Sequence, residues 1–339
     1  MSKYLIIGDE HWGASNVNSV LLEQNIKLWA FIEEFIKHNK IDCIIDLGDF
    51  FDKRKEIDSN LLNIVKKEVC DRLERLNIDL YAIVGNHNLY FRDSSKVNNI
   101  EPLADYCKNV HVIKEPTTLG DIDLIPWISS DNAIMIANFV KNSDSSYCCG
   151  HFEFTGFKFD KFSTSKCNEK ISKLSFNKYD LVFSGHFHIA SSQDNIIYTG
   201  TPIQLTWVDV DVKKYIYVLD TDTGGLSTYE VPLELYKQYK LNESTITDLF
   251  NEDIFEKRVK IFYDETFEIE HKKDFENLKI NLNKKKPDSI QFIKNPIIKE
   301  SKTIVVNETE DLKASIFDYI DKKDYKNQEL LKKLIDKLY

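Results

Sequence analysis

Residues 4–13, Tyr-Leu-Ile-Ile-Gly-Asp-Glu-His-Trp-Gly, decide the fold of this chain. The first four have the composition of a short strand, and the glycine after them permits a sharp turn. From Ser19 to His38 the apolar residues then recur at helical spacing. A strand, a polar turn and an amphipathic helix form one βα unit, and repeats of that unit predict a largely parallel sheet covered by helices.

The same unit recurs along the N-terminal two-thirds of the chain. Cys43–Leu47 is expected to be the second strand, a helix is expected from about Asp58 or Ser59 to Leu76, and Leu80–Val84 is expected to be the third strand. Further β-rich runs are Ile122–Ile125, Ser146–Cys149, Leu181–Phe183, Ile196–Tyr198 and Tyr215–Leu219. We therefore expect an α/β domain over residues 1–230.

Beyond a turn cluster at Asp222–Gly225, the pattern changes. Strand-like segments near 258–263 and 289–293 flank a helical 271–284, which predicts a small α/β module over residues 231–305. Residues 306–339 are expected to form two helices, each with an apolar stripe. Such a stripe needs a partner, and packing on the chain's own body competes evenly with docking to another protein.

Composition narrows the class of protein. No run approaches the ~18 apolar residues of a membrane span, and no signal-peptide pattern precedes the first strand, so we expect a cytoplasmic protein without a membrane partner. None of the six cysteines forms a CxxC pair, and Cys148 and Cys149 suit packing better than metal ligation. The net charge of −10 does not exclude a nucleic-acid partner, because DNA binding needs only a local basic surface.

Polar side chains follow five of the predicted strands directly. Five of the eight histidines lie in these turns, a coincidence that packing alone does not explain. Because strands of one open sheet bring their carboxyl ends to a common edge, we expect these side chains to converge there as ligands of a metal. The candidate ligands are Asp9, His11, Asp49, Asn86, His151, His186 and His188.

The ligand types indicate the metal and its chemistry. Carboxylate, imidazole and amide oxygen together suit Mn²⁺, Fe²⁺ or Zn²⁺, and the lack of thiolates argues against a structural zinc site. Seven ligands are too many for one ion. Two divalent ions ~3.5 to 4 Å apart that share a hydroxide would hydrolyse phosphate esters.

At this point the sequence resembles the calcineurin-like metallophosphoesterases. Their pattern of D-x-H, G-D-x-x-D, G-N-H-[DE], G-H and G-H-x-H is matched in order over residues 8–188. The runs Gly48–Arg54, Gly150–Gly156 and Tyr198–Trp207 resemble the SbcD type of DNA-repair nuclease, and Leu124–Trp127 is most similar to the recombination endonuclease subunits of T-even phages.

This resemblance implies a four-layer αββα core and specific roles for the ligands. Both ions are expected to be Mn²⁺. The first ion would be held by Asp9, His11 and His188. Asn86, His151 and His186 would hold the second ion, and Asp49 would bridge the two. His87 would be no ligand but the catalytic acid or charge stabiliser at the scissile phosphate.

Two residues near His87 have roles that the resemblance leaves open. Asn88 stands where the family usually has Asp or Glu; an amide can orient an imidazole but cannot raise its pKa by charge. Asp52 is expected either to support a metal ligand or to cap the following helix.

The resemblance also implies partners. The family forms homodimers, and its C-terminal region binds an ABC-type ATPase with a long coiled coil. Residues 306–339 would carry that contact, and the module at 231–305 would help to position DNA. Because the chain lacks a Gly-x-x-x-x-Gly-Lys-[ST] loop, ATP would act only through the partner. Lys53, Arg54, Lys55 and Arg92 are candidate DNA phosphate contacts, with surface solvation as the alternative.

Two alternatives compete with a Mn²⁺-dependent DNA exo/endonuclease of a recombination and repair complex. A metallophosphatase would use the same metals on phosphoprotein or small phosphoesters, but the Asp-Arg-Gly usual after its second motif is replaced by Asp52-Lys-Arg. A non-enzymatic scaffold would keep a vestigial site and act through its tail. The complete ligand set argues against that second alternative.

Overall fold

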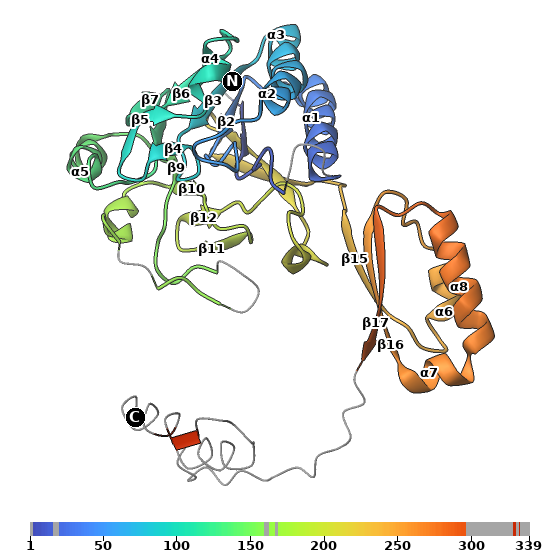
Figure 1. The fold of residues 1–339 in the computed structure, drawn as a ribbon. Coiled ribbons are helices and arrows are strands. Elements are labelled where there is room, and N and C mark those ends of the chain that lie inside the picture. Colours follow the sequence, from blue (N-terminus) through green and yellow to red (C-terminus); the bar gives the residue numbers. More distant parts are fainter. Residues whose placement is uncertain are drawn as a thin grey trace.

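The computed structural model describes residues 3–15, 20–158, 163–166, 169–295 and, in the tail, Gln328, Glu329 and Lys332 (Figure 1). The predicted pair of helices at 306–339 therefore lies outside the described residues apart from those three, as does Cys167. The division of the chain at residues 231 and 306 stays a prediction.

One six-stranded sheet begins with the opening residues of the chain. In spatial order its strands are β14 (Gly225–Glu230), β13 (Tyr215–Asp220), β1 (Lys3–Ile7), β2 (Cys43–Asp46), β3 (Asp79–Ile83) and β6 (Val110–Ile113). The neighbours from β1 to β6 pair in parallel, whereas β13 and β14 are antiparallel additions at the other edge. The parallel strands thus point their carboxyl ends in one direction.

A second six-stranded sheet contains the later strands. Its order is β11 (Ser191–Gln193), β12 (Ile196–Tyr198), β10 (Leu181–Gly185), β9 (Tyr147–His151), β8 (Ile122–Ile125) and β7 (Thr117–Leu119). The four central strands are parallel and the two outer ones antiparallel. The expectation that all ligand-bearing strands belong to one sheet is therefore wrong: three lie in the first sheet and two in the second.

Alternation of side chains along the strands explains why the two sheets stack. Tyr4 and Ile6 of β1 pack between the sheets with Phe183 of β10, whereas Leu5 and Ile7 point to the opposite face of the first sheet. A strand buried on both faces must be covered on both sides, which gives the four-layer αββα arrangement expected from the family resemblance.

Helices cover the outer face of each sheet, and Figure 1 shows them on opposite sides of the body. The first sheet carries α1 (Val20–Asn39), α2 (Ser59–Val65), α3 (Asp71–Leu76) and the short α4 (Glu101–Ala104). The second carries α5 (Ala133–Asn142) and a 3₁₀ turn at Lys173–Phe176. The helix predicted from 58 to 76 is interrupted by a π-helical stretch at Lys66–Cys70.

A small unit lies beside this body (Figure 1). Three parallel strands, β15 (Tyr236–Lys240), β16 (Arg258–Asp264) and β17 (Ser289–Asn295), share a separate core with α6 (Ile246–Asn251), α7 (Glu265–Glu270) and α8 (Lys272–Lys284). Gln204 holds its first strand to the body, because the Gln204 side-chain oxygen accepts the backbone N–H groups of Leu235 and Tyr236 at 2.9 and 2.8 Å.

The cysteines pack as the sequence predicts. Cys148 lies in the outer core under α5 and Cys149 lies between the sheets, and both are buried and free. Among the described residues, no helix is long and apolar enough to cross a membrane.

Candidate metal centre

The predicted ligands follow strands of both sheets and meet between them. Asp9 and His11 follow β1, Asp49 follows β2 and Asn86 follows β3, all in the first sheet. The second sheet supplies His151 at the end of β9 and both His186 and His188 after β10. The carboxyl ends of five parallel strands thus deliver all seven side chains to one place.

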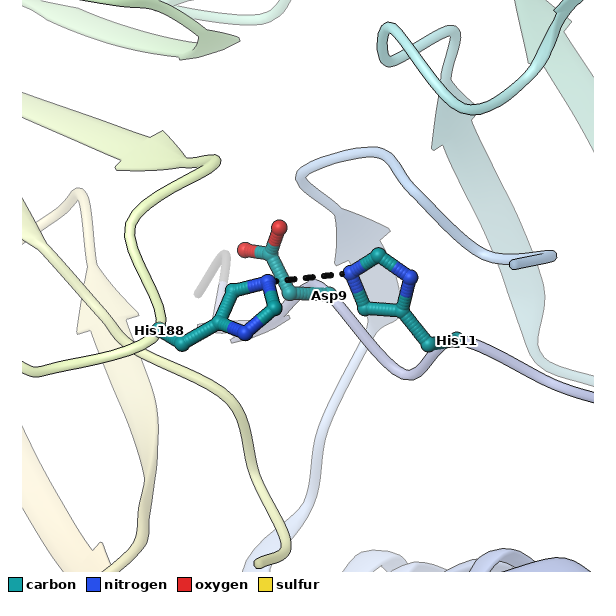
Figure 2. Close-up of side chains that lie close together, drawn as sticks. All are labelled: Asp9, His11 and His188. Atoms are coloured by element: carbon teal, nitrogen blue, oxygen red, sulfur yellow. Dashed lines mark hydrogen bonds between the residues drawn. The ribbon is translucent and has the colours of Figure 1, made fainter. Parts of the chain in front are cut away.

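The first cluster consists of Asp9, His11 and His188 (Figure 2). One ligand atom from each residue lies within 4.8 Å of the others, and Nε2 of His11 is 3.1 Å from Nε2 of His188. The other ring nitrogen of His11 lies 3.2 Å from Oδ1 of Asp52. Because Asp52 can accept the Nδ1–H, Nε2 is the ring nitrogen of His11 that faces the cluster.

The second cluster consists of Asp49, His151 and His186, again with ligand atoms within 4.8 Å. His151 donates Nδ1–H to the backbone oxygen of Leu47 at 2.8 Å, and its Nε2 lies 3.3 Å from Oδ2 of Asp49. The side-chain oxygen of Asn86 lies 2.9 Å from Nε2 of His151 and 2.9 Å from Nδ1 of His186. The amide oxygen of Asn86 therefore points at the same atoms as the carboxylate.

The backbone at this site adopts an unusual conformation. Asp9, His11, Asp49 and His186 all have positive φ angles, of 56°, 48°, 55° and 89°. Such angles are uncommon for residues other than glycine and cluster where function requires them. Gly85 lets its loop approach the loop of Asp49 closely, since a Cβ atom at residue 85 would lie 2.3 Å from Oδ1 of Asp49.

Charge is distributed unevenly over the two clusters. Burial acts to raise the pKa of Asp49, but the adjacent His151 outweighs it and the pKa falls well below its usual value. Burial likewise acts to lower the pKa of His151, yet Asp49 raises it to about 9. Burial, together with the neighbouring His11, lowers the pKa of His188 to about 3. His188 is thus a neutral imidazole, the form that binds metals.

These donor sets fit two divalent cations. Each cluster offers one carboxylate and two imidazoles, and the second adds the Asn86 oxygen, which is the chemistry that Mn²⁺, Fe²⁺ and Zn²⁺ accept. Asp49 and Asp9 are fully buried, and buried carboxylates are stable when they coordinate metals or pair with cations. The bridging role of Asp49 stays a prediction.

Comparison with known proteins identifies the family. The model of the calcineurin-like phosphoesterases matches residues 2–190, a stretch that contains both clusters. The chain belongs to the calcineurin-like phosphoesterase family. Exonuclease subunit 1 of Enterobacteria phage T4 is 36% identical over 226 residues, which make up 65% of this chain and 65% of that protein. The chain therefore matches just under two thirds of the length of this relative.

Three solved structures are similar at low identity. A dimetal phosphatase from Danio rerio is 9% identical over 64% of this phosphoesterase and 91% of its own chain, with a TM-score of 0.41. A novel archaeal phosphodiesterase is 14% identical over 68% and 99%, with a TM-score of 0.35. The Pseudomonas putida nuclease MPE is 16% identical over 63% and 83%, with a TM-score of 0.31. TM-scores this low do not support an inference about function.

His87 of the phosphoesterase lies against the first cluster. Its ring centroid is 5.0 Å from that of His11, and with His11 and Asp52 it forms a third group of neighbouring ligand atoms. His87 donates Nδ1–H to the backbone oxygen of Asp52 at 2.6 Å, and its backbone N–H donates to Oδ1 of Asp49 at 2.7 Å. Nε2 is therefore the nitrogen left for chemistry.

The Asn88 side chain contacts the backbone of two neighbouring loops and not the His87 ring. Its side-chain oxygen accepts the backbone N–H groups of Asp49 and Gly85, both at 2.9 Å, and its amide donates to Asn99 at 3.0 Å. The His87 ring is oriented by the Asp52 carbonyl instead. Asn88 thus fixes two metal loops to each other rather than the imidazole.

Two roles were considered for Asp52, namely capping of the following helix and support of a metal ligand. In the structure Asp58 caps the helix and Asp52 contacts a predicted ligand. Asp58 caps α2, because its Oδ1 accepts the backbone N–H groups of Asn60 and Leu61 at 2.8 and 3.2 Å. Asp52 instead contacts His11, so its geometry is that of a carboxylate supporting a metal ligand.

Sequence reasoning missed a buried acidic pair behind the site. Both indole N–H groups of Trp12 and Trp29 donate to Oε2 of Glu10 at 2.7 Å. Burial raises the pKa of Glu10 to about 7; burial also raises the pKa of Asp46 well above its usual value, and the Glu10 charge adds to that effect. Glu10 lay within the first motif, but nothing in the sequence showed that Trp29 would reach it.

Sequence reasoning also missed the ion pair that holds the His188 loop. Lys214 Nζ lies 2.6 Å from Oδ1 of Asp209, 2.7 Å from the Thr201 hydroxyl and 3.3 Å from the backbone oxygen of His188. Lysine and aspartate are both almost fully buried.

We expect Lys214→Met to lower the free energy of unfolding by about 3–5 kcal/mol, because it leaves a buried carboxylate unpaired. It should also weaken metal binding through His188. Urea unfolding and metal titration measure both effects. Lys213→Met is the control: Lys213 pairs with Glu230 at 2.7 Å on the surface, so its loss should cost at most about 1 kcal/mol. Equal costs for the two variants would contradict this role of Lys214.

The candidate DNA contacts line an open hollow next to His87. Lys53, Arg54, Lys55 and Arg92 border it, and its volume is about 670 Å³. Within the described part of the chain, none of these four cations forms an ion pair. Their charge is thus available to an anionic ligand, although contact with DNA stays a prediction.

Proposed function

We propose that this phosphoesterase hydrolyses phosphodiester bonds of DNA with two Mn²⁺ ions, as an exo/endonuclease subunit. The observation that carries the proposal is that His87 lies against the first of two buried metal-ligand clusters and also lines a hollow with four cations that pair with no acidic group among the described residues. Hydrolysis of a phosphate monoester needs only the metal clusters and His87. A polymer of phosphates also needs cations outside the reaction centre, and these line the adjoining hollow.

The residues divide the chemistry between them. When bound, the two divalent ions supply the nucleophile and neutralise charge on the phosphate. Asp9, His11 and His188 would hold one ion, Asn86, His151 and His186 the other, and Asp49 would lie between them. His87, anchored through Nδ1 by the Asp52 carbonyl, would use Nε2 to give a proton to the departing oxygen of the DNA strand.

A competition between substrates tests this proposal. The Mn²⁺-loaded protein is incubated with end-labelled linear duplex DNA, with a phosphopeptide and with p-nitrophenyl phosphate. We expect turnover on DNA and little on the two monoesters, with an Asp9→Ala preparation as the control for contaminating nucleases. Activity confined to the monoesters would favour the metallophosphatase and refute the nuclease.

We further propose partners for the chain. The relative from phage T4 is named as a subunit, which supports a larger assembly. An ABC-type ATPase with a coiled coil, bound through residues 306–339, and a second copy of this chain are the partners proposed, and ATP would act only through the former. We expect the chain ending at residue 308 to lose co-purification with that ATPase while it keeps basal cleavage. Retained binding would exclude the tail as the docking segment.

A further inference from the structure

Two aromatic side chains form a ledge beside the candidate site. Tyr90 and Phe91 belong to β4 (Leu89–Phe91), which pairs with β5 (Ser94–Asn98) in a hairpin directly after His87. Their side chains are 41% and 57% exposed, and their ring centroids lie 4.8 Å apart at 73°. Leu89, in contrast, is buried. Leu89 therefore anchors the hairpin in the core, while the rings of Tyr90 and Phe91 remain at the surface.

The ledge lies in the same hollow as the candidate phosphate contacts. Tyr90 and Phe91 line it together with His87 and the four cations, and Lys55 Nζ is 5.4 Å from the Tyr90 ring centroid. A cation beside an exposed aromatic ring is a favourable contact, and it leaves the ring face and the charge within reach of a ligand. Proteins that bind unpaired nucleic-acid strands combine these two features, since cations follow the phosphates and aromatic rings stack on the bases.

We infer that Tyr90 and Phe91 stack against unpaired bases of the DNA strand that enters the site. This inference rests on the proposed function and names the form of its substrate. Inside a duplex each base is covered by its neighbours on both faces, so a side chain can stack only on an unpaired base or on a terminal pair. Because the ledge directly follows His87, the stacked bases adjoin the phosphate to be cleaved.

Paired substrates isolate the contact with the bases. An oligothymidylate and an abasic strand of the same length carry the same phosphates, but only the first has bases to stack. We expect Tyr90→Ala and Phe91→Ala each to lower kcat/KM on the oligothymidylate about tenfold and to leave kcat/KM on the abasic strand unchanged. Tyr90→Phe, which keeps the ring, should retain the wild-type value.

Controls separate this inference from the proposed function. Tyr106→Ala removes a tyrosine that is 50% exposed outside the hollow and should change neither rate. If the wild-type protein cleaves no DNA, linear duplex included, the proposed function fails; if it cleaves the duplex but neither single strand, the stacking inference alone is overturned. If it cleaves both single strands and the ledge variants lose rate equally on both or on neither, the stacking inference alone is overturned. Wild-type cleavage of only the strand with bases supports stacking when the variants show the tenfold loss.

Duplex ends test whether the bases must be unpaired. The wild-type protein should cleave a duplex with mismatched terminal pairs faster than one with flush, paired ends, and Tyr90→Ala should abolish that preference. Equal wild-type rates on the two duplexes would show that the ledge does not select unpaired bases.

Discussion

His87→Ala is expected to lower DNA cleavage by about 10²–10⁴-fold while two metal ions remain bound. The imidazole is held through Nδ1 by the Asp52 carbonyl, and the proposed function assigns its other nitrogen to protonation of the departing strand. Removing it leaves the two ligand clusters intact. Steady-state cleavage and metal analysis of the purified variant measure both quantities.

Substrates with different leaving groups test the proposed proton transfer from His87 separately. DNA departs as an alkoxide, which needs a proton, whereas the nitrophenolate of bis(p-nitrophenyl) phosphate leaves readily without one. The loss caused by His87→Ala should therefore be much smaller on the nitrophenyl diester than on DNA. His38→Ala, which removes an exposed histidine of α1, is the matched control. Loss of a metal ion from the His87 variant would instead make His87 a ligand.

Asp49→Ala should have an even larger effect on the whole site. Its Oδ2 lies 3.3 Å from His151 Nε2 and its Oδ1 accepts the backbone N–H of His87, so one carboxylate joins the second cluster to the loop of His87. We expect the metal content to fall from two ions to one or none. Because bound ions supply several kcal/mol of transition-state stabilisation, cleavage should fall by about 10³-fold or more.

Asp52→Asn is the matched comparison for Asp49→Ala. Asp52 contacts His11 from outside the cluster, so its loss should weaken metal affinity by about 10–100-fold without removing a ligand. Calorimetric titration with Mn²⁺ gives stoichiometry and affinity for both variants. Two ions bound to Asp49→Ala with wild-type affinity would show that Asp49 holds neither.

The candidate site could be read from the sequence because its ligands follow strands. A short apolar run and a glycine fix locally where each turn lies, and Asp9, Asp49 and His151 all occupy such turns. What could not be predicted was which strands pair. β9 and β10 are as apolar as β1 and β2, and no local signal places them in a separate sheet.

Contacts between distant segments account for the rest. Whether Asn88 would meet His87 or the loops of Asp49 and Gly85 depends on side-chain directions that spacing does not set. The pairing of Lys214 with Asp209 is likewise fixed by packing around the His188 loop. The Tyr90–Phe91 ledge gave no sequence signal, because apolar residues in a strand are ordinarily assigned to the core.

Anomalous diffraction from Mn²⁺-loaded crystals would locate the bound ions and identify their ligands. We expect two manganese peaks about 3.5–4 Å apart, one among Asp9, His11 and His188 and one among Asn86, His151 and His186, with Asp49 between them. A single peak, or a second ion held by His87 in place of these ligands, would contradict the two-metal centre.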